Sequence, residues 1–297
     1  MPAIRPSLLL PALAALVNAT VWGIAWYPLQ WLEDHGVPAL WTTLLVFSVC
    51  TAGVLAYRPQ ALRQAWRTPQ LLWLALAAGL TNVCFNMALA GGDVVRSVLL
   101  FYLMPMWVVL LARWLLHEAI TPMAIARVVL ALAGAVLVLG QGRAMIPLPD
   151  SLADWLALVA GFCFGLNNVL LRRLAETPRE ARSLAMFGGA VICAPIGMAL
   201  MAAYGTAPVF APQAVAWIGL LLFAALVLVG NLALQYGAAR LQANVLSMLM
   251  LSEILVATLS SWIAGAATLS PVTLGGGALI IGASLLAIRS PPARAAG

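Results

Sequence analysis

Long apolar stretches recur along the chain, and charged residues fall almost entirely between them. A helix that crosses the hydrocarbon core of a bilayer needs about 20 mainly apolar residues. Cutting the sequence at charges, Pro and Gly leaves ten such stretches: 8–32, 38–57, 70–90, 94–115, 122–140, 152–171, 183–204, 212–234, 242–264 and 269–288. Only 172–182 has the charge content of a sizeable solvated loop. The pattern predicts an all-α membrane protein with ten transmembrane helices.

The arginines indicate which helix ends face the cytoplasm, because cytoplasmic loops of membrane proteins carry an excess of basic residues. With the N-terminus inside, 13 of the 15 basic residues, all Arg, are cytoplasmic, and only Arg96 and Arg143 lie outside. The outer side instead collects acids: Glu33, Asp34, Asp93, Asp150 and Asp154. We therefore predict a multi-pass protein of the cell inner membrane with both termini cytoplasmic.

Composition excludes a soluble protein. The chain is 64% hydrophobic and 8% charged, whereas a soluble domain carries about 25% charged residues. A pI near 9.7 could indicate nucleic acid, but the arginines lie in short gaps between apolar runs, so no nucleic-acid partner is expected. The apolar run after Arg5 is too long for a cleaved signal peptide. The four cysteines are scattered singly, so neither a metal site nor a cofactor is predicted.

The two halves of the chain resemble each other weakly but in the same order. The matched features are Trp22-Gly23 with Phe164-Gly165, the pair Asn86 and Asp93 with Gln235 and Gln242, and Thr121-Pro122 with Ser270-Pro271. We predict two repeats, 1–143 and 150–297. Each has five helices, an odd number, so the second must insert inverted. Inverted repeats are an architecture of secondary transporters, with the substrate site between the halves near the midplane.

Several motifs resemble a known family. They are Trp22-Gly23 in the first helix, Leu103-Met104-Pro105 leading through His117-Glu118 to Thr121-Pro122, and Leu251-Ser252-Glu253 in the ninth helix. The chain resembles the drug/metabolite transporter (DMT) superfamily, its EamA-type ten-helix members, and among those the YddG-type amino-acid exporters. The resemblance implies export of amino acids, aromatic ones included, and related compounds. One departure is the family's usual Gly-Glu, which reads His117-Glu118 here and is missing from 264–267 in the second half.

Polar side chains inside the apolar stretches are few, and each is a candidate substrate ligand. Asn82 and Asn86 share one helix face, as do Asn231 and Gln235 in the matching helix of the second half. Asn168 and Ser247 complete the polar set. Such groups could bind the ammonium and carboxylate of an amino acid. The alternative is hydrogen bonding between helices that only holds the bundle together.

Aromatic residues away from the predicted helix ends form a second candidate set, which suits an amphipathic metabolite. Its members are Trp22, Trp26, Phe85, Tyr102 and Phe164. Glu253 is the only acid deep within a predicted span. It is a candidate for proton coupling or cation recognition; the alternative is a protonated or capped Glu bonded to a neighbouring helix. In the repeat it aligns with Pro105.

The sequence lacks the features that other functions would require. There is no Gly-Lys-Ser/Thr phosphate loop for an ATP-driven pump, and the two histidines lie far apart, so no enzyme is expected. A carrier of nucleotide-linked metabolites should place Arg in its cavity, where only Arg96 qualifies; we expect Arg96 to pair with Asp93. We predict a secondary transporter that exports amino acids by alternating access and can act as a monomer in the lipid bilayer. The alternatives are an uncoupled facilitator, a transporter of another metabolite class such as nucleotide-linked metabolites and, last, a membrane enzyme.

Overall fold

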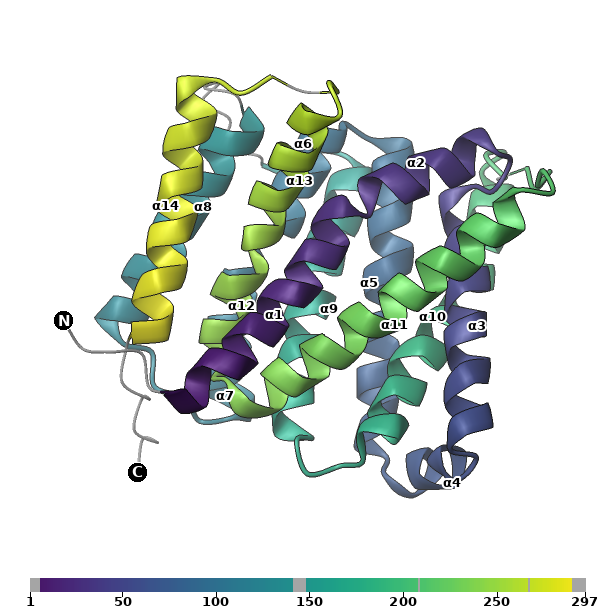
Figure 1. Cartoon of the computed structure of the whole chain (residues 1–297), viewed down its shortest axis with the longest axis horizontal. Coiled ribbons are helices and arrows are strands. Elements are labelled where there is room, and N and C mark those ends of the chain that lie inside the picture. The colour runs from purple at the N-terminus through teal and green to yellow at the C-terminus, as the bar shows by residue number, and fades with distance from the viewer. Residues whose placement is uncertain (1–5, 141–147, 208, 267, 290–297) are drawn as a thin grey trace.

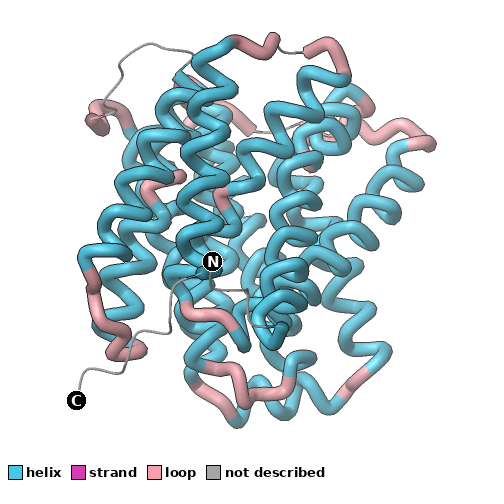
Figure 2. The backbone as a smooth tube through the Cα atoms, turned by 60° about the vertical axis from the view of Figure 1, so that its left-hand side comes forward, coloured by secondary structure: helices cyan, strands magenta, loops and turns pink. Residues whose placement is uncertain are grey.

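The computed structural model describes residues 6–140, 148–207, 209–266 and 268–289, and all regular structure in these ranges is helical (Figures 1 and 2). The helices are α1 Pro6–Ile24, α2 Trp26–Asp34, α3 Ala39–Tyr57, α4 Gln60–Arg67, α5 Gln70–Gly91, α6 Val94–Phe101, α7 Met104–Leu115, α8 Pro122–Gly140, α9 Leu152–Arg173, α10 Arg179–Ala203, α11 Ala216–Arg240, α12 Ala243–Met250, α13 Ser252–Ile263 and α14 Pro271–Arg289. The proposed repeat boundary at 143 lies outside the described residues.

The helices are those of a membrane bundle. Within the described ranges, nine spans are long and apolar enough to cross a bilayer, and α14 adds a shorter apolar stretch over Pro271–Ala287. This confirms the predicted fold class. The loop predicted at 172–182 is wrong in extent, because α9 continues to Arg173 and α10 begins at Arg179. Arg182 is buried, and its guanidinium donates to the Leu171 carbonyl at 3.3 Å.

Three spans are broken into two helices, and local chemistry accounts for each break. Pro28 and Pro105 lack the N–H that would bond to the carbonyl four residues earlier, which explains the ends of α1 at Ile24 and of α6 at Phe101. In the third break, the Ser252 hydroxyl donates to the Leu249 carbonyl at 2.6 Å and competes with the helical ladder. The breaks place irregular backbone inside the bundle, where transporters build their sites.

The packing of the two halves follows one pattern. Helix α1 packs on α11 and α13, while α9 packs on α5 and α7; α3 pairs with α10, and α8 with α14. The broken spans also match in length, since α6 and α12 have 8 residues each and α7 and α13 have 12 each. Helices α8 and α14 come close at Gly134 and Gly276, where a Cβ on either glycine would lie within 2.7 Å of the other's carbonyl oxygen.

The bundle has two ends, named here by their elements. The α4 face carries α4, the ends of α3 and α7, and the turns that lead from α9 to α10 and from α11 to α12 (lower side of Figure 1). The opposite face carries the turns from α2 to α3 and from α13 to α14. There, the N–H groups of Ala211 and Gln213 donate to the carbonyls of Gly36 and His35 at 3.0 and 3.1 Å.

Candidate functional site

Two of the broken spans, α6–α7 and α12–α13, are joined by a polar contact. The Tyr102 hydroxyl donates to Oε1 of Glu253 at 2.6 Å. Tyr102 lies in the turn between α6 and α7 and is only 6% exposed, whereas Glu253 is partly exposed at the start of α13. The structure thus joins two candidates that are 151 residues apart in the chain. It also gives the carboxyl group deep in this span a hydroxyl partner.

Aromatic rings gather beside this pair. Phe101 is central, with ring centroids 4.6 Å from Phe85, 5.5 Å from Tyr102 and 5.6 Å from Phe164. Phe85 and Phe164 were predicted from their mid-span positions, but Phe101 was not. Its place four residues before Pro105, at the end of a helix that the proline interrupts, was the signal that could have identified it. Together these rings form an apolar, π-rich wall next to one carboxyl group.

The glycines of the aromatic-Gly motifs allow close helix contact at matching places. A Cβ on Gly23 of α1 would lie 2.8 Å from the Glu253 carbonyl oxygen and 2.6 Å from the Val256 Cβ. Gly165 of α9 faces α7 less tightly, with the Trp107 Cβ at 3.3 Å. Gly23 therefore fixes how closely α1 approaches the helix that carries Glu253.

This difference predicts unequal effects of the same substitution. Gly23→Ala should destabilise the protein by about 1–3 kcal/mol, the usual range for overpacking, because backbone of α13 must move. Gly165→Ala should cost much less, since a shift of a few tenths of an ångström relieves its contacts. Thermal unfolding of the two purified variants checks this. Equal losses would show that the Gly23 contact does not constrain α13.

The two tryptophans of the first span have different surroundings. The Trp26 indole N–H donates to the Ser260 hydroxyl at 2.9 Å, which links α2 to α13 seven residues after Glu253 in the same helix. Trp22 packs against a separate apolar cluster that includes Ala25, Phe47 and Phe187. Trp26 therefore contacts the helix that carries Glu253, whereas Trp22 packs in an apolar cluster.

The predicted amides find partners within the protein. Asn86 donates to the Thr43 hydroxyl on α3 at 3.1 Å, and Asn82 donates to the Ala78 carbonyl of its own helix at 2.9 Å. In the second half, Gln235 donates to the Ser183 hydroxyl at 2.6 Å and to Asn231 at 2.7 Å. The amide pairs of α5 and α11 thus bond to different neighbours. The Asn86 and Gln235 bonds to the two hydroxyls are interhelical, which is the alternative that the sequence left open, whereas the Asn82–Ala78 and Gln235–Asn231 bonds lie within one helix.

The remaining polar candidates are more deeply buried. The Asn168 amide contacts the Met104 sulfur at 3.8 Å, and the Ser247 hydroxyl donates to the Asn244 carbonyl at 2.9 Å. Both side chains are fully buried. Among the hydrogen bonds of the described residues, none joins either side chain to Tyr102 or Glu253.

Residues 9–140 match the model of the EamA-like transporter family. The matched residues lie in the first half of the chain, which is therefore similar to that family. The chain is also 27% identical over 284 residues to the probable terminal-alkyne amino-acid exporter of Streptantibioticus cattleyicolor, with 92% of this chain and 91% of that protein covered.

A solved structure supports the same fold. A protein of known crystal structure superposes with a TM-score of 0.75 at 22% identity, over 93% of this chain and 96% of the other. At this identity the likeness concerns the fold alone. The all-helical architecture is thus shared over nearly the whole chain, including the half that lies beyond the family match.

The EamA-type Gly-Glu position has a structural explanation here. His117 follows the end of α7 with a φ of 58°, in the left-handed region that favours glycine, and Gly265 after α13 has a φ of 74°. Both sit where a helix commonly ends in a left-handed residue. The glycine of the family motif therefore suits this backbone, and His117 adopts it at a cost.

Glu118 continues from this turn to cap another helix. Its Oε1 accepts from the Ala243 N–H, the first of α12, at 3.3 Å, while its Oε2 is buried without a hydrogen-bond partner among the described residues. Burial raises the pKa of the Glu118 carboxyl above its ordinary value, although the N–H groups of Ala243 and Asn244 and the charge of Arg172 oppose the shift. Arg172 itself donates to the Ala239 carbonyl. On the α4 face, the Glu118 carboxyl group thus joins the turn after α7 to the start of α12 and lies near the Arg172 charge of α9.

The structure corrects the expected partner of Arg96. Asp93 caps α6 by accepting from the Arg96 backbone N–H at 2.7 Å. The Arg96 guanidinium instead lies 2.8 Å from an Asp150 oxygen and 3.2 Å from one of Asp154, at the start of α9. The predicted ion pair with Asp93 is wrong, because Asp93 accepts from the Arg96 backbone and the guanidinium pairs with the two acids near the start of α9. Arg96 joins α6 to α9 at the opposite face.

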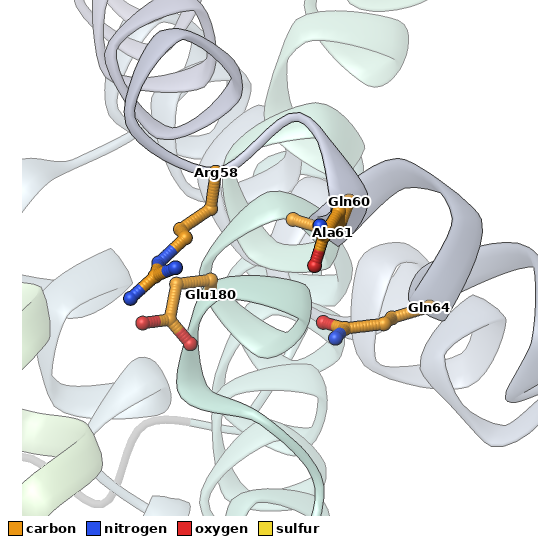
Figure 3. Close-up of a pocket in the computed structure, with 5 residues that line it drawn as sticks. All are labelled: Arg58, Gln60, Ala61, Gln64 and Glu180. Atoms are coloured by element: carbon orange, nitrogen blue, oxygen red, sulfur yellow. The ribbon is translucent and has the colours of Figure 1, made fainter.

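One cleft in the described residues lies away from this site. It has a volume of about 160 Å³ and lies on the α4 face between α4 and the start of α10. Figure 3 shows Arg58 and Glu180 facing each other across it, with Gln64 pointing in from α4; Gln60 and Ala61 complete the lining. No group of three or more His, Cys, Asp or Glu side chains within the described ranges could hold a metal ion.

Proposed function

We propose that this chain is an EamA-type transporter that exports amino acids across the inner membrane, with both termini and the α4 face in the cytoplasm. The observation that carries the proposal is the Tyr102–Glu253 pair beside the ring cluster of Phe85, Phe101 and Phe164. A carboxylate inside a span suits an ammonium group, and the rings suit an apolar side chain. The name of the relative, a probable amino-acid exporter, supports the same substrate class.

The proposed mechanism is alternating access between two inverted halves, 1–143 and 150–297. Three features support it. The broken spans match in length, α1 and α9 make equivalent contacts, and α8 pairs with α14, its equivalent in the other half. Rocking of the halves would move the breaks that carry Tyr102 and Glu253. A substrate favours one of the two states only through a difference in affinity, so Glu253 would exchange Tyr102 for the substrate ammonium in one of them.

Transport by the purified protein in liposomes tests the substrate class. We expect uptake of labelled apolar and aromatic amino acids, and competition by their amines lacking the carboxyl group. The matching 2-hydroxy acids, which lack the ammonium, should neither compete nor be transported. Repeating the assay with and without a pH gradient separates proton coupling from facilitated diffusion.

Two results would contradict the proposal. Equal transport of a 2-hydroxy acid and its amino acid would remove the role of Glu253 in ammonium recognition. Transport of other metabolites, with no amino acid accepted, would assign the protein to another substrate class. Empty liposomes and heat-denatured protein supply the background.

A further inference from the structure

Helix α4 is the one helix of the described chain that the ten predicted spans do not include. It begins two residues after α3 and is bracketed by Pro59 and Pro69. Its own Ala61 is fully buried, and the helix packs on α10 and α3. Only Arg58 and Pro59 separate it from the candidate span α3, so we infer that α4 lies near the lipid headgroups.

The outer side of α4 is apolar along one stripe. Leu62 and Trp66 are four residues apart and so share a face. They are 49% and 82% exposed. Tryptophan is enriched at the membrane interface, where its ring lies among the headgroups and the first acyl carbons. The beginning of α5 continues this surface with the exposed side chains of Leu72 and Trp73.

A basic stripe runs beside the apolar one. Arg63 and Arg67, again four residues apart, are exposed, as is Arg58 just before the helix. The chain has no acid between Asp34 and Asp93, so this segment carries uncompensated positive charge. Among the ion pairs of the described residues, none includes Arg63 or Arg67. The nearby acid of the cleft, Glu180, lies 3.5 Å from the Arg179 guanidinium.

We propose that α4 and the residues beside it form a docking surface for anionic phospholipids of the leaflet that covers the α4 face. Apolar Leu62 and Trp66 would enter the acyl boundary while the guanidinium groups of Arg63 and Arg67 bind headgroup phosphates. Basic helices with Trp and Leu on the other face bind membranes in this way, and juxtamembrane arginines attract anionic lipids. The inference goes beyond the proposed function and depends on neither the transported substrate nor the direction of transport.

Lipid binding to the intact purified protein tests the proposal. Native mass spectrometry would count bound lipids as phosphatidylglycerol or phosphatidylcholine of the same acyl chains is added. We expect the native protein to prefer phosphatidylglycerol about tenfold. The variant Arg63→Gln/Arg67→Gln should lose that preference, and Trp66→Ser should weaken binding of both lipids. Glycerol phosphate, a soluble headgroup without acyl chains, should bind far more weakly than the lipid.

The matched control is Arg113→Gln/Arg240→Gln. It removes the same charge from exposed arginines of the same face, at the ends of α7 and α11. This variant should keep the preference for phosphatidylglycerol. If it loses the preference as completely as the α4 variant, the attraction belongs to the net charge of the face and the proposal is overturned. An unchanged preference in Arg63→Gln/Arg67→Gln would overturn it as well.

Discussion

Replacing Glu253 with Gln should reduce amino-acid transport at least tenfold, and replacing Tyr102 with Phe should reduce it to a similar degree. Gln keeps the size of the side chain and an acceptor for the Tyr102 hydroxyl, but it cannot pair with an ammonium group. Phe keeps the ring packing and leaves the Glu253 carboxyl without its 2.6 Å partner. A polar group that loses its partner inside the protein costs about 1–3 kcal/mol, which changes the equilibrium between states by roughly five- to 160-fold.

The measurement is initial transport rate in liposomes containing equal amounts of each variant. Tyr204→Phe and Glu33→Gln serve as matched controls, because both side chains are exposed and should keep native rates. If the two residues act as one unit, the double variant should transport no more slowly than the worse single variant. Independent, multiplying losses would show that the hydrogen bond does not couple the two residues. Native rates in both single variants would place the substrate elsewhere.

Replacing Glu118 with Ala should open the α4 face. The first N–H of α12 loses its acceptor, and loss of a helix cap costs about 0.5–2 kcal/mol, which corresponds to an increase of roughly two- to thirtyfold in the open population. A cysteine at Val245, a buried position in α12, should react correspondingly faster with a water-soluble thiol reagent. The native cysteines are buried, which limits background labelling. Glu118→Gln keeps an acceptor and should have a smaller effect.

The same assay has a pH dependence with a defined sign. Because the pKa of Glu118 is raised in the packed arrangement, that arrangement binds the proton more tightly than one with Glu118 in water. Its stabilisation is present at pH values below the ordinary glutamate pKa and is lost as the pH rises through the raised value. Labelling at position 245 should therefore increase over this window relative to Glu118→Gln, which has no proton to lose. If labelling at position 245 depends on pH in the same way with and without Glu118→Gln, the protonation of Glu118 does not control the opening.

Much of the fold followed from hydrophobicity alone, because a bilayer demands helices of one length with apolar surfaces. The spans beginning near 38, 70, 94, 122 and 152 agree with the structure to within a few residues. Helix α4 escaped prediction since eight residues with two arginines resemble a loop on any hydropathy scale. The start of α10 was misplaced for the same reason, because its first turn carries Arg179, Glu180 and Arg182.

The site was harder to predict, because partners depend on which helices become neighbours. Sequence identified Tyr102 and Glu253 separately, through their rarity at mid-span, but nothing in it joined them. It could identify the amide pairs by spacing, yet Asn86 bonds to Thr43 and Gln235 to Ser183, two hydroxyls that no pattern distinguished. Glu118 was identified only through a family motif, whose physical basis appears once α12 is seen to start beside it.

The crossing of α8 and α14 limits how this sequence can change. At Gly134 and Gly276 the obstruction to an added side chain is the backbone carbonyl of the opposite glycine. No choice of side chain at one position can make room at the other, so the two positions cannot exchange compensating substitutions as ordinary core neighbours do. Each position therefore requires glycine whatever residue stands at the other. A larger residue at either one would force the two helices apart.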